Sequence, residues 1–348
     1  MRTAISINPR HAAHDDPQHV EQAARLHAIT AALNASGLRS SLLEVTARSA
    51  TEAHLRAVHT AQMIELVRWS ATRPRSWIDH DTYTTSASWD AALMAAGTTM
   101  AVVEAVVSGA AHNGFALVRP PGHHATPTDS MGFCLFNNVA VAARYAIDHL
   151  SIGRVAIVDF DVHHGNGTQD IFYEDDRVFF CSTHAAPLYP GTGAEREIGS
   201  GKGRGTTLNL PLPHGVGDAG FARLFNEVVI PAILRYRPDL ILVSAGYDGH
   251  WADPLGPLTL SVTGYAALTA RLMEAAEEVC NGRIVLVLEG GYHVRALAAS
   301  VMACLEVLAN ESSVVDPLGP AGEPEPDVSA LIARMRQNHP LLASQSIS

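Results

Sequence analysis

The sequence predicts an α/β fold in which a single central, mostly parallel β-sheet carries helices on both faces. Short apolar runs of strand length alternate with helical stretches along most of the chain, and such alternation is typical of parallel sheets. No linker rich in Pro and Ser interrupts the series, which indicates one large domain. We place that domain at residues 1–315 and a peripheral tail with one short helix at residues 316–348.

The elements follow from the hydrophobic pattern in chain order. A helix is expected over Glu21 to Ala35, where Ser36-Gly37 ends it, and a second helix covers residues 51–70. Residues 77–85 form a polar loop in this interpretation. Beyond them, strands are expected near Gly114, Val155, Val178, Thr206, Leu240 and Ile284, and helices near Asn137, Phe221, Thr263 and Val294.

The longest apolar stretch, residues 91–111, contains Glu104, two glycines and several hydroxyl groups. A helix that spans a bilayer needs about 20 predominantly apolar residues. We therefore interpret this stretch as a buried helix that is interrupted or bent near Gly97. The amino-terminal residues also lack an apolar core of signal-peptide length, so neither a membrane segment nor a secretion signal is expected.

Composition narrows the classes of function. The chain has 348 residues, of which 47% are hydrophobic and 17% charged, as in ordinary globular proteins. A formal net charge of −11 argues against a nucleic-acid-binding face, because phosphate contacts require clustered Lys and Arg. The four cysteines show no close pairing, which indicates a reducing compartment and a cytoplasmic location.

The segment VAIVDFDVHHGNG, residues 155–167, places polar side chains at the end of an apolar strand. Asp159, Asp161 and His163 alternate, and side chains in a strand have a period of two. If the backbone stays extended, Asp161 and His163 point the same way, and a carboxylate beside an imidazole suits zinc or ferrous iron. The alternative is a polar surface loop after a buried strand.

Three other segments follow the same pattern. His123 and His124 come after an apolar run and a Pro-Pro-Gly turn, Asp248 follows the run DLILVSA, and Tyr292 follows RIVLVL and two glycines. The carboxyl ends of parallel strands meet at one edge of a sheet, where ligands collect. Asp161, His163 and Asp248 are then the metal ligands, which leave room for water and a substrate carbonyl.

Six motifs extend this pattern over most of the chain. They are RPPGHHA (119–125), GFCLFNN (132–138), DFDVHHGNGTQDIFY (159–173), YPGTG (189–193), SAGYDGHWADPLG (244–256) and LEGGY (288–292). On these residues the chain resembles the histone deacetylase and acetylpolyamine amidohydrolase family, which has the arginase-deacetylase fold. Asn166 and LEGGY resemble the class II branch and the bacterial amidohydrolases of the family. Residues 1–315 would then be the deacetylase catalytic domain.

The resemblance implies a zinc-dependent hydrolase that removes acyl groups from N-acyl-lysine. His124 would take a proton from the attacking water and return it to the leaving amine, while His123 supplies positive charge. Asp159 would hold His123, and Asn166 would hold His124 with an amide that supports an imidazolium less well than a carboxylate does. Tyr292 would donate its hydroxyl to the developing oxyanion.

The resemblance also assigns substrate contacts. Phe133, with Gly132 before it, and Tyr189 would flank a tunnel for the acyl-lysine stem. Asp81 would bind the substrate backbone at the rim, although a solvated loop aspartate is an equal alternative. Leu255 favours acyl-lysine peptides or proteins over acetylated polyamines, because polyamine-selective relatives in one branch carry a glutamate there.

Ions other than the catalytic metal are implied by the resemblance alone. In one alternative, iron takes the place of zinc in cells, because both metals accept the same ligands. Two structural potassium sites are expected, largely through backbone oxygens. The first would use Asp159, Asp161, His163, Ser182 and Thr183, and the second Phe172, Asp175 and Val178.

Other functions stay open at this point. An acetylpolyamine amidohydrolase is the nearest alternative. An arginase-like ureohydrolase is more remote, because His250 stands where a second aspartate would hold a second metal. A non-catalytic module that binds acyl-lysine is the third alternative, and a homo-oligomer is left open. The family's amino-terminal signature is altered to His19-Val20-Glu21-Gln22, which affects the tunnel mouth.

Overall fold

The structure is a computed structural model that describes residues 2–311 and 314–343. Its centre is an eight-stranded sheet with the order β2-β1-β5-β10-β9-β6-β7-β8, and every neighbouring pair in it is parallel. The predicted α/β fold with a parallel sheet is confirmed. The strands are β1 (Thr3–Ile7), β2 (Leu43–Glu44), β5 (Asn113–Leu117), β6 (Val155–Asp159), β7 (Val178–Ala185), β8 (Thr207–Leu212), β9 (Leu240–Ala245) and β10 (Ile284–Leu288).

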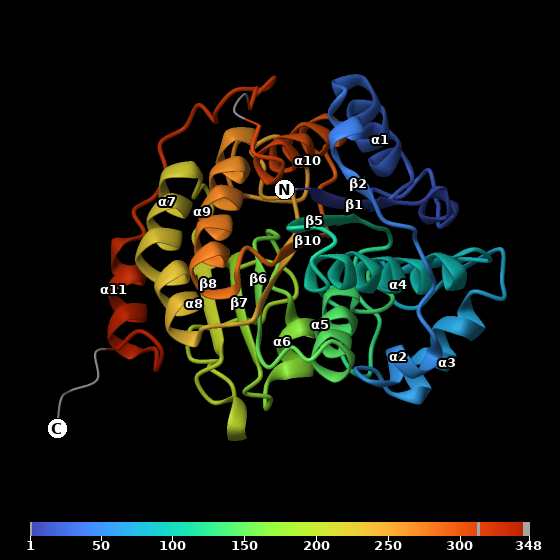
Figure 1. The fold of residues 1–348 in the computed structure, drawn as a ribbon, viewed down its shortest axis with the longest axis horizontal. Coiled ribbons are helices and arrows are strands. Elements are labelled where there is room, and N and C mark those ends of the chain that lie inside the picture. The colour runs from blue at the N-terminus through green and yellow to red at the C-terminus, as the bar shows by residue number, and fades with distance from the viewer. Residues whose placement is uncertain (1, 312–313, 344–348) are drawn as a thin grey trace.

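Helices cover both faces of this sheet, which Figure 1 shows most clearly for α1 and α10 on one side of β5 and β10 and α4 on the other. The strands are therefore buried along almost their whole length. In β6, Ala156 and Val158 belong to the core under α1 and α7–α10, whereas Val155 and Ile157 belong to the core under α3–α5. The helices are α1 (Ala24–Ser36), α2 (Glu52–Arg56), α3 (Ala61–Ser70), α4 (Ser88–Val107), α5 (Asn138–His149), α6 (Asn166–Phe172), α7 (Asp218–Leu224), α8 (Ile230–Tyr236), α9 (Val262–Cys280), α10 (Val294–Leu308) and α11 (Ser329–Asn338), with a π-helical turn (Phe225–Val229) between α7 and α8 and short 3-10 helices at Pro9–Ala13, Leu38–Ser41 and Gly201–Gly203.

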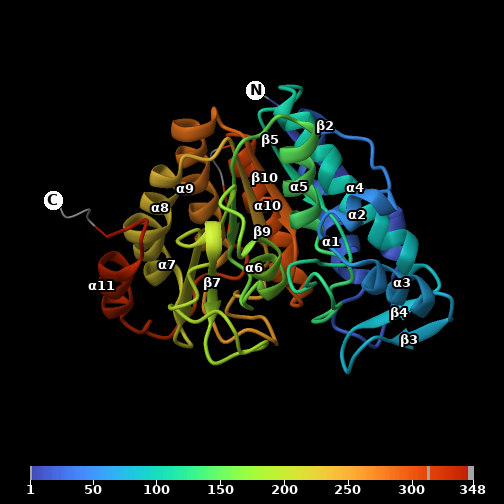
Figure 2. The same ribbon diagram turned by 90° about the horizontal axis from the view of Figure 1, so that it is seen from below.

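Two predicted elements differ from the structure. The helix expected over residues 51–70 is divided into α2 and α3, because the Thr60 side chain accepts a hydrogen bond from Met63 N and starts a new helix. The predicted loop at 77–85 is a hairpin of β3 (Arg75–Trp77) and β4 (Tyr83–Thr85), which projects beside α3 in Figure 2. Its turn is closed by Asp79, whose Oδ1 accepts from two backbone N–H groups.

The helix α4 is buried, as predicted, but it continues through Gly97 without interruption. A Cβ atom at Gly97 would lie 2.1 Å from Arg48 O and 2.4 Å from Ala50 N. The absence of a side chain at Gly97 therefore lets the segment at residues 48–50 pack directly against α4. Of the described helices, α4 is the one long and apolar enough to cross a membrane, and 72% of its most apolar stretch is buried inside the fold.

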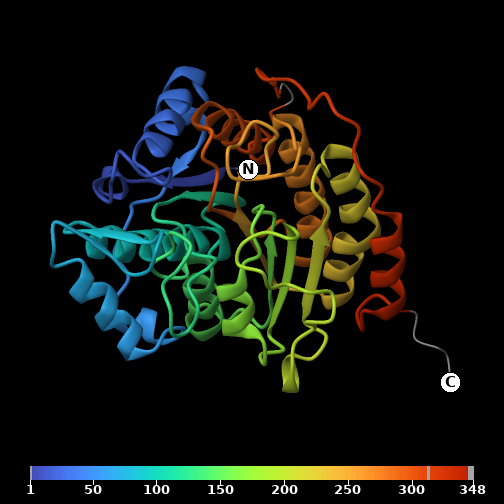
Figure 3. The same cartoon turned by 180° about the vertical axis from the view of Figure 1, so that it is seen from behind.

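The segment from residue 316 onward lies at the periphery, where α11 packs beside α7 and α8 in Figure 3. Its Leu331, Ile332 and Met335 are buried. Glu325 accepts hydrogen bonds from the backbone N–H groups of Gly217, Ala219 and Gly220 at 2.7–2.9 Å, which ties the segment to the start of α7. The last five residues of the predicted tail, 344–348, lie outside the described residues. The domain boundary at 315 stays a prediction.

Candidate active site

Three predicted ligands converge at the carboxyl edge of the sheet. Asp161 and His163 follow β6, and Asp248 follows the neighbouring strand β9. One ligand atom of each lies within 4.8 Å of the others. The expectation of an extended backbone here is wrong, because β6 ends at Asp159. Asp159 and Asp161 instead accept hydrogen bonds from the backbone two residues later, at 3.0 and 2.9 Å, and these turns bring the side chains together.

The chemistry of this cluster fits a divalent cation. Both carboxylates are buried, and Asp248 Oδ2 lies 3.2 Å from His163 Nδ1 without hydrogen-bond geometry. Burial and the charge of Asp161 raise the pKa of Asp248, so the pair is unfavourable without a cation. Burial alone would lower the pKa of His163, but the two carboxylates raise it to about 10. A dication would take the place of that proton and neutralise the carboxylates.

Two imidazoles lie beside this cluster and differ in their partners. His123 Nδ1 is 2.9 Å from Asp159 Oδ2, and His124 Nδ1 is 2.8 Å from Asn166 Oδ1. The ring centroids are 4.0 Å apart, and both side chains are buried. The structure thus brings together both pairs that the sequence suggested, one with a carboxylate and one with an amide.

Burial and the surrounding charges set opposite charge states for the two imidazoles. Burial alone would lower the pKa of His123, but Asp161 and Asp159 raise it to about 10. Burial, together with the charges of His123 and His163, holds the pKa of His124 well below its usual value. At neutral pH His123 is therefore a cation and His124 a free base. This is the arrangement that a proton acceptor beside a fixed positive charge requires.

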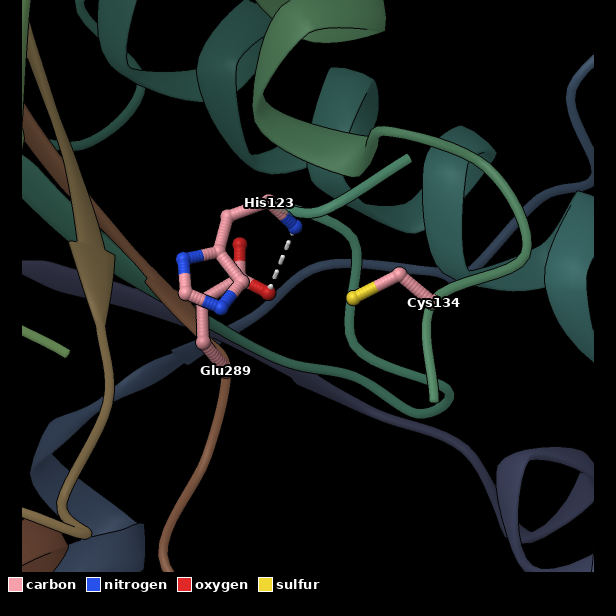
Figure 4. Close-up of side chains that lie close together, drawn as sticks. All are labelled: His123, Cys134 and Glu289. Atoms are coloured by element: carbon pink, nitrogen blue, oxygen red, sulfur yellow. Dashed lines mark hydrogen bonds between the residues drawn. The ribbon is translucent and has the colours of Figure 1, made fainter. Parts of the chain in front are cut away.

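Glu289, to which the sequence analysis gave no role, anchors the histidine turn. Its Oε2 accepts hydrogen bonds from Gly122 N at 2.6 Å and His123 N at 3.2 Å, the second of which Figure 4 shows. Figure 4 also shows the Cys134 thiol turned toward this group. Burial raises the pKa of Cys134 well above its usual value and that of Glu289 to about 7. A neutral thiol and a carboxyl held by backbone N–H groups make a positioning contact rather than a second metal site.

Tyr292 reaches the site after two glycines that follow β10. Gly290 N donates to Asp161 Oδ2 at 2.9 Å, and a Cβ atom at Gly290 would lie 2.2 Å from Asp248 Oδ2. Only glycine allows this approach. The Tyr292 ring lies edge-on to Phe133, with centroids 5.6 Å apart. The two glycines thus bring the backbone before Tyr292 against the ligand cluster, and the role of the phenol stays a prediction.

Comparison with known proteins places this arrangement in a family. Residues 19–308 match the model of the histone deacetylase domain. The chain belongs to the histone deacetylase family. It is 38% identical over 344 residues to a probable deacetylase of Archaeoglobus fulgidus, a match that covers 97% of this chain and 93% of that protein.

Further members of the histone deacetylase family show how far the likeness extends. The chain is 50% identical over 238 residues to the chloroplastic histone deacetylase 14 of Arabidopsis thaliana, covering 67% of this chain but 56% of that protein. It is 37% identical over 302 residues to a histone deacetylase-like amidohydrolase of Pseudomonas aeruginosa, a match that covers 86% of this chain and 80% of that protein. The crystal structure of the HDA15 HD domain superposes with a TM-score of 0.85 at 38% identity, covering 92% of this chain and 90% of that one.

In this histone deacetylase domain, two predicted tunnel aromatics flank the histidines and the tyrosine. The Tyr189 ring stands edge-on to His124, with centroids 5.1 Å apart. Gly132 and Phe133 both have positive φ, 57° and 69°. A Cβ atom at Gly132 would lie 2.5 Å from the His124 ring and 2.9 Å from the Tyr189 ring, so this position requires glycine. His19, which the sequence analysis did not assign, lies 4.7 Å from the Phe133 ring.

The two predicted rim residues are linked to the aromatic residues indirectly. Asp81 accepts from the Thr82 hydroxyl at 3.2 Å, and that hydroxyl accepts from Phe133 N at 3.1 Å. Leu255 is half-buried and donates its backbone N–H to the Asp253 carboxylate at 3.0 Å. Neither contact identifies a substrate, so both assignments stay predictions.

The predicted potassium ligands lie around the same strands. Ser182 and Thr183 are on β7, where Ser182 pairs with Asp159 of β6 and Thr183 Oγ1 donates to Asp159 O at 3.2 Å. In the second set the carbonyls of Phe172 and Asp175 accept hydrogen bonds from Asp175 N and Val178 N. Both potassium sites stay predictions.

A buried ionic cluster behind Tyr292 was missed by sequence reasoning. Glu21 accepts from Arg25 at 2.9 Å and from Arg119 Nη2 at 2.7 Å, and all three side chains are buried. Arg25 donates to Gly291 O and lies 5.0 Å from the Tyr292 ring centroid. The available signal was the charged Arg25 on the buried face of α1, beside the altered amino-terminal signature. A charge there is buried only when it is paired.

Proposed function

We propose that the protein is a zinc-dependent deacylase that removes acetyl or other acyl groups from the side-chain amine of N-acyl-lysine in peptides or proteins. The observation that carries the proposal is the position of His124. It is a neutral imidazole held by Asn166, beside the cationic His123 and the cluster of Asp161, His163 and Asp248.

The residues divide the work of amide hydrolysis. The chemistry supplied by a dication on the three ligands is Lewis acidity and a more acidic water. His124 accepts the proton of the attacking water and then gives it to the leaving amine, which departs as a neutral molecule. His123 supplies a fixed positive charge near the developing oxyanion, and Tyr292 donates its hydroxyl to that oxygen. Phe133 and Tyr189 exclude water from the site.

The substrate class is the finer part of the proposal. The rings of Phe133 and Tyr189 suit the methylene stem of a lysine, and Leu255 supplies no carboxylate for a distant ammonium. An acetylpolyamine amidohydrolase is the second candidate. It is favoured by Asp79 and Asp81, whose carboxylates lie close together in the hairpin near Phe133, and by the printed name of the Pseudomonas relative.

Two remoter functions have less support. An arginase-like ureohydrolase would need a second metal, but His250 lies outside the cluster of Asp161, His163 and Asp248. A non-catalytic reader of acyl-lysine would not need His124, Asn166 and Tyr292 together. We also propose iron as an alternative metal and potassium as a structural ion. We propose the cytoplasm as the location, because the four cysteines are buried and unpaired.

The test compares two substrates with one catalyst. Zinc-loaded protein is incubated with an acetyl-lysine peptide and with acetylputrescine or acetylspermidine at matched concentrations, with Asp161→Ala as the blank. A higher kcat/KM for the peptide supports the lysine deacylase, and a higher value for the polyamine supports the second candidate. Equal turnover by the wild type and the blank would overturn both.

A further inference from the structure

Asp253 is a buried carboxylate outside the ligand cluster and the histidine pairs. Its Oδ2 accepts hydrogen bonds from two consecutive backbone N–H groups, Tyr292 N at 2.6 Å and His293 N at 2.9 Å. Its Oδ1 accepts from Leu255 N at 3.0 Å. Asp253 is 8% exposed. Three backbone donors thus converge on one carboxylate, which is a group with acceptors only.

The chain needs such an anchor at Tyr292. Two glycines precede the tyrosine, and Gly291 has a φ of 116°, a conformation that residues with a side chain rarely adopt. After Tyr292 the rigid helix α10 begins, with His293 as its N-cap. A carboxylate at the N-terminus of a helix is stabilised by the helix dipole. Asp253 therefore fixes the backbone of the tyrosine at the junction between the glycine turn and α10.

We infer that Asp253 positions Tyr292 for catalysis and couples its position to that of Leu255, the proposed substrate contact. The inference rests on the proposed function, because it assigns to Asp253 the orientation of the phenol that stabilises the oxyanion. The coupling is direct: the oxygen that holds Leu255 and the oxygen that holds Tyr292 belong to one rigid group. A shift of the backbone at Leu255 would therefore move the backbone of Tyr292.

An amide cannot replace this carboxylate without loss. Asparagine would present an NH₂ group either to Leu255 N or to the two N–H groups of Tyr292 and His293, and donor would face donor. Asp253→Asn is thus close to the native shape but breaks the anchor. Asp253→Glu keeps the charge and extends the side chain by one methylene, so it recovers part of the activity.

The decisive test is a double-mutant cycle with Tyr292→Phe. Asp253→Asn is expected to lower kcat by about tenfold to a hundredfold, as misplacement of a catalytic group does. In the Tyr292→Phe background the same substitution is expected to change kcat by less than about twofold, because the hydroxyl it positions is gone. Bound zinc is measured in each variant and is expected to stay equal to the wild type.

The matched control is Asp239→Asn. Asp239 also accepts from two consecutive backbone N–H groups, Gly153 N at 3.0 Å and Arg154 N at 2.8 Å, but it precedes β9 at the opposite edge of the sheet and is exposed. The Asp239→Asn substitution is expected to leave kcat unchanged. If Asp253→Asn does not fold, Asp253→Glu enters the cycle in its place.

Each outcome separates the inference from the proposed function. Equal losses from the Asp253 substitution in both backgrounds, or loss of zinc, would overturn the inference and leave the proposed function intact. Full activity of Tyr292→Phe would overturn the catalytic role of the phenol, and with it the reason for an anchor. Absence of deacylation by the wild type on both substrates would overturn the proposed function itself.

Discussion

Asn166 holds His124: the amide oxygen lies 2.8 Å from the imidazole Nδ1, while the neighbouring His123 has a carboxylate in the same place. The two buried imidazoles differ in charge because Asp161 and Asp159 raise the pKa of His123, whereas burial and the charges of His123 and His163 lower the pKa of His124. An amide oxygen accepts a hydrogen bond without adding a negative charge, so it orients His124 and leaves it a free base.

Asn166→Asp is expected to shift the pH dependence of turnover. The new carboxylate raises the pKa of His124, which burial and the charges of His123 and His163 otherwise hold low. The base is active only when neutral, so activity falls as the pH drops through its pKa. The acidic limb of kcat/KM therefore moves to higher pH. Asn226→Asp adds the same charge at an exposed position and is expected to leave the profile in place; an unmoved limb in Asn166→Asp contradicts the role of His124.

Tyr292→Phe is expected to lower kcat/KM by about 10²–10³, the usual cost of losing one oxyanion donor. The ring remains, so its contacts with Phe133 and Arg25 persist and the thermal midpoint changes little. Steady-state kinetics and thermal unfolding on the same preparation check both statements. Wild-type turnover by the variant would mean that the phenol is not the donor.

Removal of the metal is expected to abolish turnover and lower the unfolding temperature. Burial and the charge of Asp161 raise the pKa of Asp248, so the empty cluster is destabilising. An ion that binds the folded state alone at a hundredfold excess over its Kd adds about 2.7 kcal/mol to stability. Dialysis against a chelator followed by addition of zinc or ferrous iron tests this. Asp161→Ala should show no stabilisation by either ion, and a chelated wild type with full activity would rule out metal dependence.

Gly97→Ala is expected to destabilise the fold by about 1–3 kcal/mol, the cost of forcing a group into a packed contact. The added Cβ would lie 2.1 Å from Arg48 O, a backbone atom that cannot rotate away. Gly322→Ala is the control, because a Cβ atom there meets nothing within 4 Å. Chemical denaturation of the two variants measures the difference in their free energy of unfolding. Equal stabilities would show that the segment at residues 48–50 moves away to make room for the added Cβ atom.

Local pattern was enough to predict six of the eight strands of the sheet, without β1 and β2, and to group the ligand residues. Strands buried on both faces give continuous apolar runs, and a polar side chain directly after such a run must lie at the carboxyl edge of the sheet. Asp161, His163 and Asp248 could be grouped on this ground alone. The hairpin at Asp79 was missed because its strands are three residues each, too short to show a period.

The sequence by itself thus determined the fold class, the family and the residues gathered at one edge of the sheet, because each has a signature within a few neighbouring positions. Only the tertiary structure decided the contacts that hold those residues in place. Asp253 accepts from Tyr292 N, Glu289 accepts from His123 N, and Arg25 donates to Gly291 O. These contacts join segments between 39 and 266 positions apart. A buried acceptor of backbone N–H groups has the same local sequence as a surface carboxylate, and only the approach of a distant segment distinguishes the two.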